Sequence, residues 1–242
     1  MYPILFTMGP WPVHSYYLLW TAALSLAVVL ARGRMTRFGS VDDDSARFII
    51  ISAFFGMLLG ARLGSILDSL PLYTRDPLKL LRFWEGGLSA VPAFLGAGAA
   101  GVWASRRKGV PLWIVADSAS IPAALAVSIG RWGCYLNGCC IGTASSLPWS
   151  VHFPFDPSDL SRHPVQLYYA FGTLAIAAVL YLLEPLLPQA REREKISGAV
   201  LWPLFMILYS LLRLALDVLR KEYSAAGLQS VRVMLFGISA AG

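Results

Sequence analysis

Five charged side chains lie inside or at the edges of long apolar segments, and their chemistry suits the binding of an anion. They are Arg62, Asp117, Arg131, Arg213 and Asp217. A charge at the centre of a bilayer costs about 2.5–3.5 kcal/mol, so such residues usually face a protein interior and mark a functional site. Guanidinium groups stay charged and donate forked hydrogen bonds to phosphate. Arg213 and Asp217 are four positions apart on one helix face and could simply pair, but three arginines together predict a site for an anionic head group.

A glycine-rich segment over 130–142, with the sequence GRWGCYLNGCCIG, follows one of these apolar stretches. Glycine lets the backbone approach a ligand closely. Irregular backbone at membrane depth is tolerated only where it is buried in protein or lines a polar cavity. We therefore expect a loop here that forms a wall of the site, with Gly138 and Gly142 beside the substrate. All three cysteines of the chain, Cys134, Cys139 and Cys140, lie in this segment.

A second polar motif, His163-Pro164-Val165-Gln166-Leu167-Tyr168, opens a later apolar stretch. Proline is favoured at the first helical position because its missing N–H has no partner there in any case. We expect His163 and Gln166 to cap this helix, and contact with the substrate is the alternative.

The composition places these motifs in a membrane. Hydrophobic residues make up 57% of the 242 residues and charged residues 14%, against about 45–50% and about 25% in soluble proteins. So apolar a chain is neither a soluble globule nor intrinsically disordered. The net charge of +6 could suit nucleic acid in a soluble protein, but a bilayer explains it better, and we expect no nucleic acid partner.

Apolar runs near the length of about 20 residues that a bilayer requires predict an all-α integral membrane protein. We expect about seven transmembrane helices around a polar, arginine-lined central cavity. One transmembrane domain would cover 1–242, with a loop region over about 130–163 on the outer face. The predicted spans are 13–31, 48–67, 88–104, 112–129, 165–183, 199–219 and a short one from 228.

The distribution of Lys and Arg predicts the orientation of the chain. The loops after the first, third and fifth spans carry more of them than the opposite loops, and basic loops stay in the cytoplasm. This places the N-terminus outside and the C-terminus inside. No basic region or small-residue cleavage site precedes the first span, so we expect no cleavable signal peptide. The run Asp42-Asp43-Asp44 is expected to cap the second helix.

Six sequence motifs, in order along nearly the whole chain, resemble the prolipoprotein diacylglyceryl transferase family of bacterial inner-membrane enzymes. They are LFTMGPWPVHSYYLLW near the N-terminus, GARLG at 60–64, WEGGLS at 84–89, GRWGCYLNGCCIG at 130–142, HPVQLY at 163–168 and YSLLRLALDVLR at 209–220. The resemblance implies transfer of the diacylglyceryl group of phosphatidylglycerol, or a similar anionic phospholipid, to a cysteine thiol. The acceptor would be the signal peptide of a preprolipoprotein, and glycerol phosphate would be released.

The resemblance also implies roles for individual residues. Arg131 and Arg213 would bind or stabilise the phosphate, and Asp217 stands where the family has a glutamate that orients the arginine. Asn137 would line the head-group site, and Tyr16 would contact substrate from the first helix. The remaining expected substrate contacts are Arg62, Glu85, Gly138, Gly142, His163 and Gln166.

The chain departs from the family pattern at four further positions. The resemblance places an essential histidine where this chain has Val91, and a valine cannot accept a proton. The family's asparagine and Glu-Leu pair correspond here to Cys134 and to Cys139-Cys140. These departures indicate a divergent paralogue that keeps the lipid-donor machinery and alters the acceptor chemistry.

The three cysteines allow several interpretations. They could take part in transfer, form a disulfide on the oxidising face or hold a soft metal; buried, inert thiols are the structural alternative. An odd number leaves at least one thiol free. We assign no metal ligands and expect no cofactor. The rival function is a non-enzymatic protein that binds anionic lipid, or that senses redox state or binds metal through Cys134, Cys139 and Cys140.

Overall fold

The computed structural model is mostly helical, and it describes residues 1–9, 11–80, 89–154, 156, 158–187 and 199–220. Two short antiparallel pairs of strands accompany the helices: β1 (Ile4–Met8) with β2 (Trp11–His14), and β3 (Val151–His152) with β4 (Ser161–Arg162). The helices are α1 (Ser15–Arg37), α2 (Asp43–Asp68), α3 (Leu70–Arg75), η1 (Pro77–Leu80), α4 (Ala90–Arg107), α5 (Leu112–Asn137), α6 (Val165–Leu183), η3 (Glu184–Leu186) and α8 (Leu201–Asp217).

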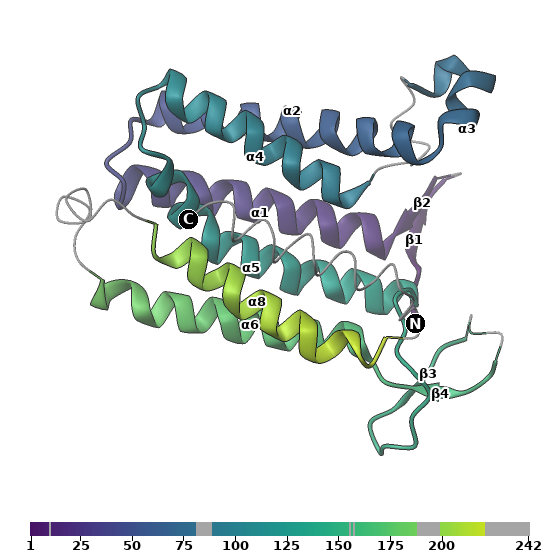
Figure 1. Ribbon diagram of the computed structural model, residues 1–242. Helices are drawn as coiled ribbons and strands as arrows, with labels where there is room; N and C mark the ends of the chain where they lie inside the picture. Colours follow the sequence, from purple (N-terminus) through teal and green to yellow (C-terminus); the bar gives the residue numbers. More distant parts are fainter. Residues whose placement is uncertain (10, 81–88, 155, 157, 188–198, 221–242) are drawn as a thin grey trace. The chain divides into compact units, whose positions relative to one another are not determined.

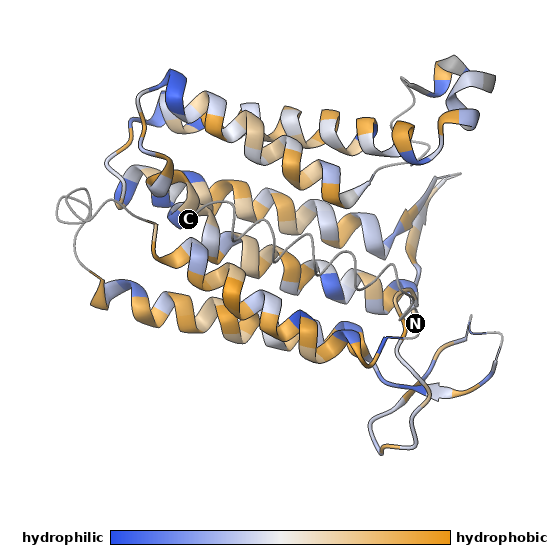
Figure 2. Cartoon of the chain, viewed as in Figure 1, coloured by the Kyte–Doolittle hydropathy of each residue, from blue (hydrophilic) through white to orange (hydrophobic). Residues whose placement is uncertain are grey.

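Four of the described helices are long and apolar enough to cross a membrane. They are Ser15–Arg37, Asp43–Asp68, Leu112–Asn137 and Val165–Leu186. Apolar residues cover most of their length (Figure 2), and many large apolar side chains point outward, such as Phe55 and Leu182. Outward apolar surface of this kind is what lipid requires. The chain is therefore an all-α membrane protein. Helices α4 and α8 coincide with two further predicted spans, whereas the predicted span from 228 lies outside the described residues.

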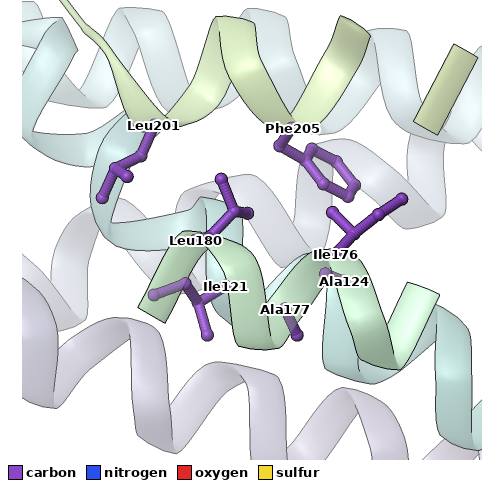
Figure 3. Close-up of a cluster of buried hydrophobic side chains, with 7 residues drawn as sticks. All are labelled: Ile121, Ala124, Ile176, Ala177, Leu180, Leu201 and Phe205. Atoms are coloured by element: carbon purple, nitrogen blue, oxygen red, sulfur yellow. The ribbon is translucent and has the colours of Figure 1, made fainter. Parts of the chain in front are cut away.

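The chain divides into two compact units. One consists of Met1–Leu30 and Ala119–Gly242, and the other of Ala31–Ser118. In the first unit, helices α6 and α8 lie side by side (Figure 1). Their core is a cluster of apolar side chains that α5, α6 and α8 all contribute (Figure 3). Its members are Ile121, Ala124, Ile176, Ala177, Leu180, Leu201 and Phe205.

The second unit is built on the packing of α2 against α4 (Figure 1). Gly60 and Gly96 face the backbone of the opposite helix so closely that a Cβ at either position would collide with it. Small residues of this kind let two helices approach in a membrane, where close packing replaces the hydrophobic drive to associate. The Ser89 N–H donates to the Ala61 carbonyl (3.0 Å) at the start of α4. The family-like GARLG motif thus has a packing role.

Side chains satisfy backbone groups of α2 and α5 that the helices themselves leave without a partner. The Asp42 carboxylate accepts the Ser45 N–H (2.8 Å) and caps α2, as predicted; this bond lowers the pKa of the Asp42 carboxyl. Pro122 within α5 has no N–H to offer the carbonyl four residues before it, that of Ser118. Arg34 Nε donates to that carbonyl instead (3.2 Å).

Candidate active site

The glycine-rich segment begins as helix rather than loop. Helix α5 continues to Asn137, so the prediction of a loop is wrong for 130–137. The reason is that Gly130 and Gly133 serve helix packing. A Cβ on Gly130 would lie 2.6 Å from the Trp20 ring, and one on Gly133 would lie 3.4 Å from the Tyr16 backbone. Both glycines therefore allow α1 to approach α5 closely, and they provide no free backbone for a ligand.

Helix α5 ends in a Schellman turn at Gly138. The Cys139 N–H donates to the Cys134 carbonyl and the Gly138 N–H to that of Tyr135, each over 3.1 Å. This pair of bonds defines the Schellman motif, which requires a left-handed backbone conformation at the first residue after the helix. Gly138 supplies it with a φ of 72°. The turn folds Cys139 back over Cys134, one turn earlier on the helix.

Alanine in place of Gly138 should destabilise this turn, because left-handed backbone costs an L-residue about 1–2 kcal/mol. The matched control is Gly98→Ala. Gly98 lies within α4, and a Cβ there meets nothing within 4 Å. We expect Gly138→Ala to lower the thermal unfolding temperature of the detergent-solubilised chain and Gly98→Ala to leave it unchanged or raise it. Equal unfolding temperatures for the two variants would contradict the assigned role of Gly138.

The Schellman turn brings the three cysteines together. Their Sγ atoms all lie within 4.8 Å of one another; we call Cys134, Cys139 and Cys140 the thiol cluster. All three are free, and Cys134 is buried. Cys140 itself has a left-handed φ of 59°, which is uncommon for a residue with a side chain. Hydrogen bonds from the other two thiols, and the positive charge of Arg131 and Arg220, lower the pKa of the Cys140 thiol.

Three arginines surround a buried tyrosine and aspartate beside the thiol cluster. The Arg131 guanidinium carbon lies 4.3 Å from the centre of the Tyr169 ring. The Tyr169 hydroxyl donates to Asp217 Oδ1 (3.0 Å). Asp217 also pairs with Arg213 (3.4 Å) and Arg220 (3.7 Å). We call these five residues the arginine network. Three guanidinium groups and one carboxylate leave two positive charges, which makes the network suitable for a phosphate group.

Arg213 does pair with Asp217, as their spacing allows. Arg131 differs from both other arginines. Among the described residues, no carboxylate forms an ion pair with its guanidinium. Its described contact is instead the face of the Tyr169 ring. Cation–π stacking leaves the forked N–H donors of an arginine available to another partner.

The predicted cap of α6 by His163 or Gln166 is wrong. Pro164 is the residue before the helix, and no side chain caps it. Gln166 is fully buried, and its Nε2 donates to the Cys139 carbonyl (2.6 Å). His163 Nδ1 lies 3.2 Å from the Tyr168 hydroxyl, which accepts the Trp149 indole N–H (2.8 Å). Gln166 thus bonds a carbonyl 27 residues away and His163 lies against the Tyr168 hydroxyl, so neither side chain caps the helix.

Gly142 connects the glycine-rich segment over 130–142 to two other parts of the chain through its backbone. Its N–H donates to the His163 carbonyl (3.2 Å), and a Cβ on Gly142 would lie 2.5 Å from that oxygen. Gly142 also forms a β-bridge with Arg220 just after α8, next to the bond from Thr143 N–H to the Leu219 carbonyl (2.8 Å). This bridge places Arg220 beside the thiol cluster.

Four of the expected substrate contacts remain, namely Asn137, Tyr16, Arg62 and Glu85. Asn137 is the last residue of α5, and its side chain hydrogen-bonds the Cys139 thiol. Tyr16 stands at the start of α1 and interacts electrostatically with all three thiols. Arg62 is buried in the other unit, where its guanidinium carbon lies 5.3 Å from the Tyr73 ring centre. Glu85 lies outside the described residues.

Sequence reasoning missed Tyr169 and Arg220. Tyr169 follows Gln166 by three positions, so the two share a face of α6, and this spacing could have indicated it. Arg220 follows Asp217 by three positions, but it lies beyond the predicted span 199–219. Its place beside the cysteines depends on the β-bridge to Gly142, and no local sequence pattern predicts this bridge.

Long apolar helices with charged groups held among them define the class as an all-α membrane protein. The family model described as prolipoprotein diacylglyceryl transferase matches residues 3–241. The chain therefore belongs to the prolipoprotein diacylglyceryl transferase family, and it is a transferase.

Bacterial relatives support this membership over most of their length. A protein of Geobacter sulfurreducens named phosphatidylglycerol–prolipoprotein diacylglyceryl transferase is 32% identical over 228 residues, which cover 93% of this chain and 85% of that protein. A protein of the same name from Solidesulfovibrio magneticus is 34% identical over 255 residues, with 98% and 92% covered. A third, from Synechococcus elongatus, is 28% identical over 248 residues, with 98% and 85% covered.

Proposed function

We propose that this protein moves the diacylglyceryl group of phosphatidylglycerol to the cysteine thiol of a prolipoprotein in the bacterial inner membrane. The observation that carries the proposal is the arginine network, in which Arg213 and Arg220 pair with Asp217 and Arg131 stacks on the Tyr169 ring. The names of the bacterial relatives supply the same two substrates. The acceptor thiol attacks the terminal glyceryl carbon, the bond from that carbon to the phosphate oxygen breaks, and glycerol phosphate leaves.

Arg131 is proposed to bind the phosphate. As the carbon–oxygen bond breaks, negative charge grows on the departing phosphate, and fixed donors in a water-poor site stabilise such charge most. The Tyr169 ring beneath Arg131 holds the guanidinium in place. Arg213 is held by Asp217 on the same helix, so that it is oriented in advance to share the phosphate.

Polar groups near the thiol cluster are proposed to bind the glycerol of the head group. Gln166 Oε1 is buried and has no hydrogen-bond partner among the described residues. A buried acceptor left in this state is costly, and a glycerol hydroxyl that donates to it would remove the cost. Asn137, Gly138, Gly142, His163 and Tyr16 would complete this part of the site.

We further propose that the protein has seven membrane spans around an arginine-lined cavity, in one transmembrane domain over 1–242. The N-terminus lies outside and the C-terminus inside, and the segment that follows α5 faces the periplasm together with β3 and β4. A signal peptide would present its thiol from the same side.

The test is a transfer reaction with the purified full chain in detergent. Phosphatidylglycerol radiolabelled in both its diacylglyceryl and head-group parts is incubated with a lipobox peptide, and lipidated peptide and released glycerol phosphate are both measured. We expect the two products in equal amounts. Release of glycerol phosphate without lipidated peptide would reject the lipobox acceptor. Neither product would reject the transferase proposal as a whole.

A further inference from the structure

The thiol cluster is arranged as an incomplete metal site. Its three Sγ atoms lie within 4.8 Å of one another, and no histidine or carboxylate of the described part of the chain joins them. His163 is turned to the Tyr168 hydroxyl (3.2 Å), and His152 pairs with Asp159 (2.9 Å). Three protein ligands with an open fourth position are the arrangement of a catalytic zinc site, whereas structural zinc sites are closed by four.

We propose that Cys134, Cys139 and Cys140 bind a zinc ion whose open fourth position takes the thiol of the acceptor. This inference rests on the proposed transferase function, because the substrate of that reaction is itself a thiol. Zinc prefers thiolate ligands, and a thiol that coordinates it is deprotonated outright. The metal would thus generate the nucleophile without a basic side chain.

The geometry of the cluster needs little change to accept the ion. Zinc–sulfur bonds of about 2.3 Å in a tetrahedral site place the sulfur atoms about 3.8 Å apart, against separations within 4.8 Å here. The backbone that carries the thiols is fixed by the Schellman turn and by the bond from Gln166 to the Cys139 carbonyl. Such bonds to the ligand segment orient the ligands, as partners around a metal site commonly do.

The surrounding charge also fits a zinc ion with three thiolates. That group carries one net negative charge, which burial makes costly unless a positive charge is near. Arg131 and Arg220 provide positive charge at Cys140. Arg131 is also the residue proposed to bind the phosphate, so the sulfur and the phosphate of the two substrates would be held next to each other.

The proposed step balances without an oxidant or reductant. The acceptor thiol binds the metal and releases its proton to water. The sulfur electron pair then forms a bond with the terminal glyceryl carbon, and the electrons of the broken carbon–oxygen bond leave with glycerol phosphate. The thioether product is a weak ligand, and its departure reopens the fourth position.

The first measurement is the zinc content of the purified chain by mass spectrometry. We compare the unchanged chain, the three single Cys→Ser variants, their triple combination and Thr143→Ala. Thr143 lies three residues after Cys140, and its described hydrogen bonds are made by its backbone. We expect one zinc ion per chain in the unchanged protein and in Thr143→Ala, and none in the triple variant. Cobalt in place of zinc should give a thiolate charge-transfer absorption that the triple variant lacks.

The second measurement is peptide lipidation after removal of zinc with a chelator and after its return. We expect a fall of about 10²-fold or more, comparable to the loss of a catalytic base, and recovery with zinc. Absence of zinc, a disulfide within the cluster or zinc retained by the triple variant would overturn the inference. Because zinc content is measured without any substrate, the two proposals fail separately. Lipidation by a zinc-free chain rejects the metal alone, whereas bound zinc without lipidation rejects the transferase and the role of zinc in it.

Discussion

Replacement of Arg131 by alanine is expected to reduce release of glycerol phosphate by about 10²–10³-fold, the usual cost of removing one donor that stabilises charge in the transition state. Arg131 has no ion pair with the described carboxylates, and its guanidinium rests on the Tyr169 ring at 4.3 Å. Its donors are therefore free for the phosphate. Since no hydrogen bond or ion pair within the described part of the chain depends on them, the unfolding temperature should change far less than the rate.

Two further variants separate geometry from charge at this position. Arg131→Lys keeps the positive charge but loses the planar fork and the stacking, so we expect an intermediate rate. Arg106→Ala removes an exposed arginine at the end of α4 and should leave the rate unchanged. The measurement is release of labelled glycerol phosphate at saturating and at limiting phosphatidylglycerol. An Arg131→Ala chain that releases it at the normal rate would reject the phosphate site.

Replacement of Asp217 by alanine is expected to cause the largest loss of stability. Asp217 is buried, accepts hydrogen bonds from Tyr169 and Arg213, and forms an ion pair with Arg220. Removal of one partner from a buried charged network costs about 3–5 kcal/mol, because the remaining charges lose their compensation. We expect a marked fall in the unfolding temperature of the detergent-solubilised chain, together with loss of transfer because Arg213 is no longer held.

Two further variants test which property of Asp217 stabilises the protein, its charge or its hydrogen bond with Tyr169. Asp217→Glu keeps the charge and should retain part of the stability. Tyr169→Phe removes one hydrogen bond to a charged group, which contributes about 1.5–3 kcal/mol, and keeps the ring under Arg131. We expect stability to fall in the order unchanged chain, Tyr169→Phe, Asp217→Ala. An Asp217→Ala chain as stable as the unchanged one would mean that the three arginines need no counter-charge.

The local predictions that succeeded are those whose cause is local. The cap at Asp42 and the pairing of Arg213 with Asp217 depend on residues three or four positions apart, and such spacing can be read directly from a sequence. The predictions that failed depend on distant partners. Gly130 and Gly133 suggested a loop, but they are present because α1 packs against them. Gln166 suggested a cap, but it donates to the Cys139 carbonyl, 27 residues away.

The sequence by itself determined that this is an all-α membrane protein and drew attention to its arginines and cysteines. The physical reason is that lipid demands long apolar helices and makes each charge within them conspicuous. Only the tertiary structure decided which of these residues meet. Gln166 meets the Cys139 carbonyl across 27 residues, Tyr169 joins Asp217 across 48 residues, and the bridge at Gly142 brings in Arg220. Contacts of this kind depend on how helices pack, and no local spacing encodes them.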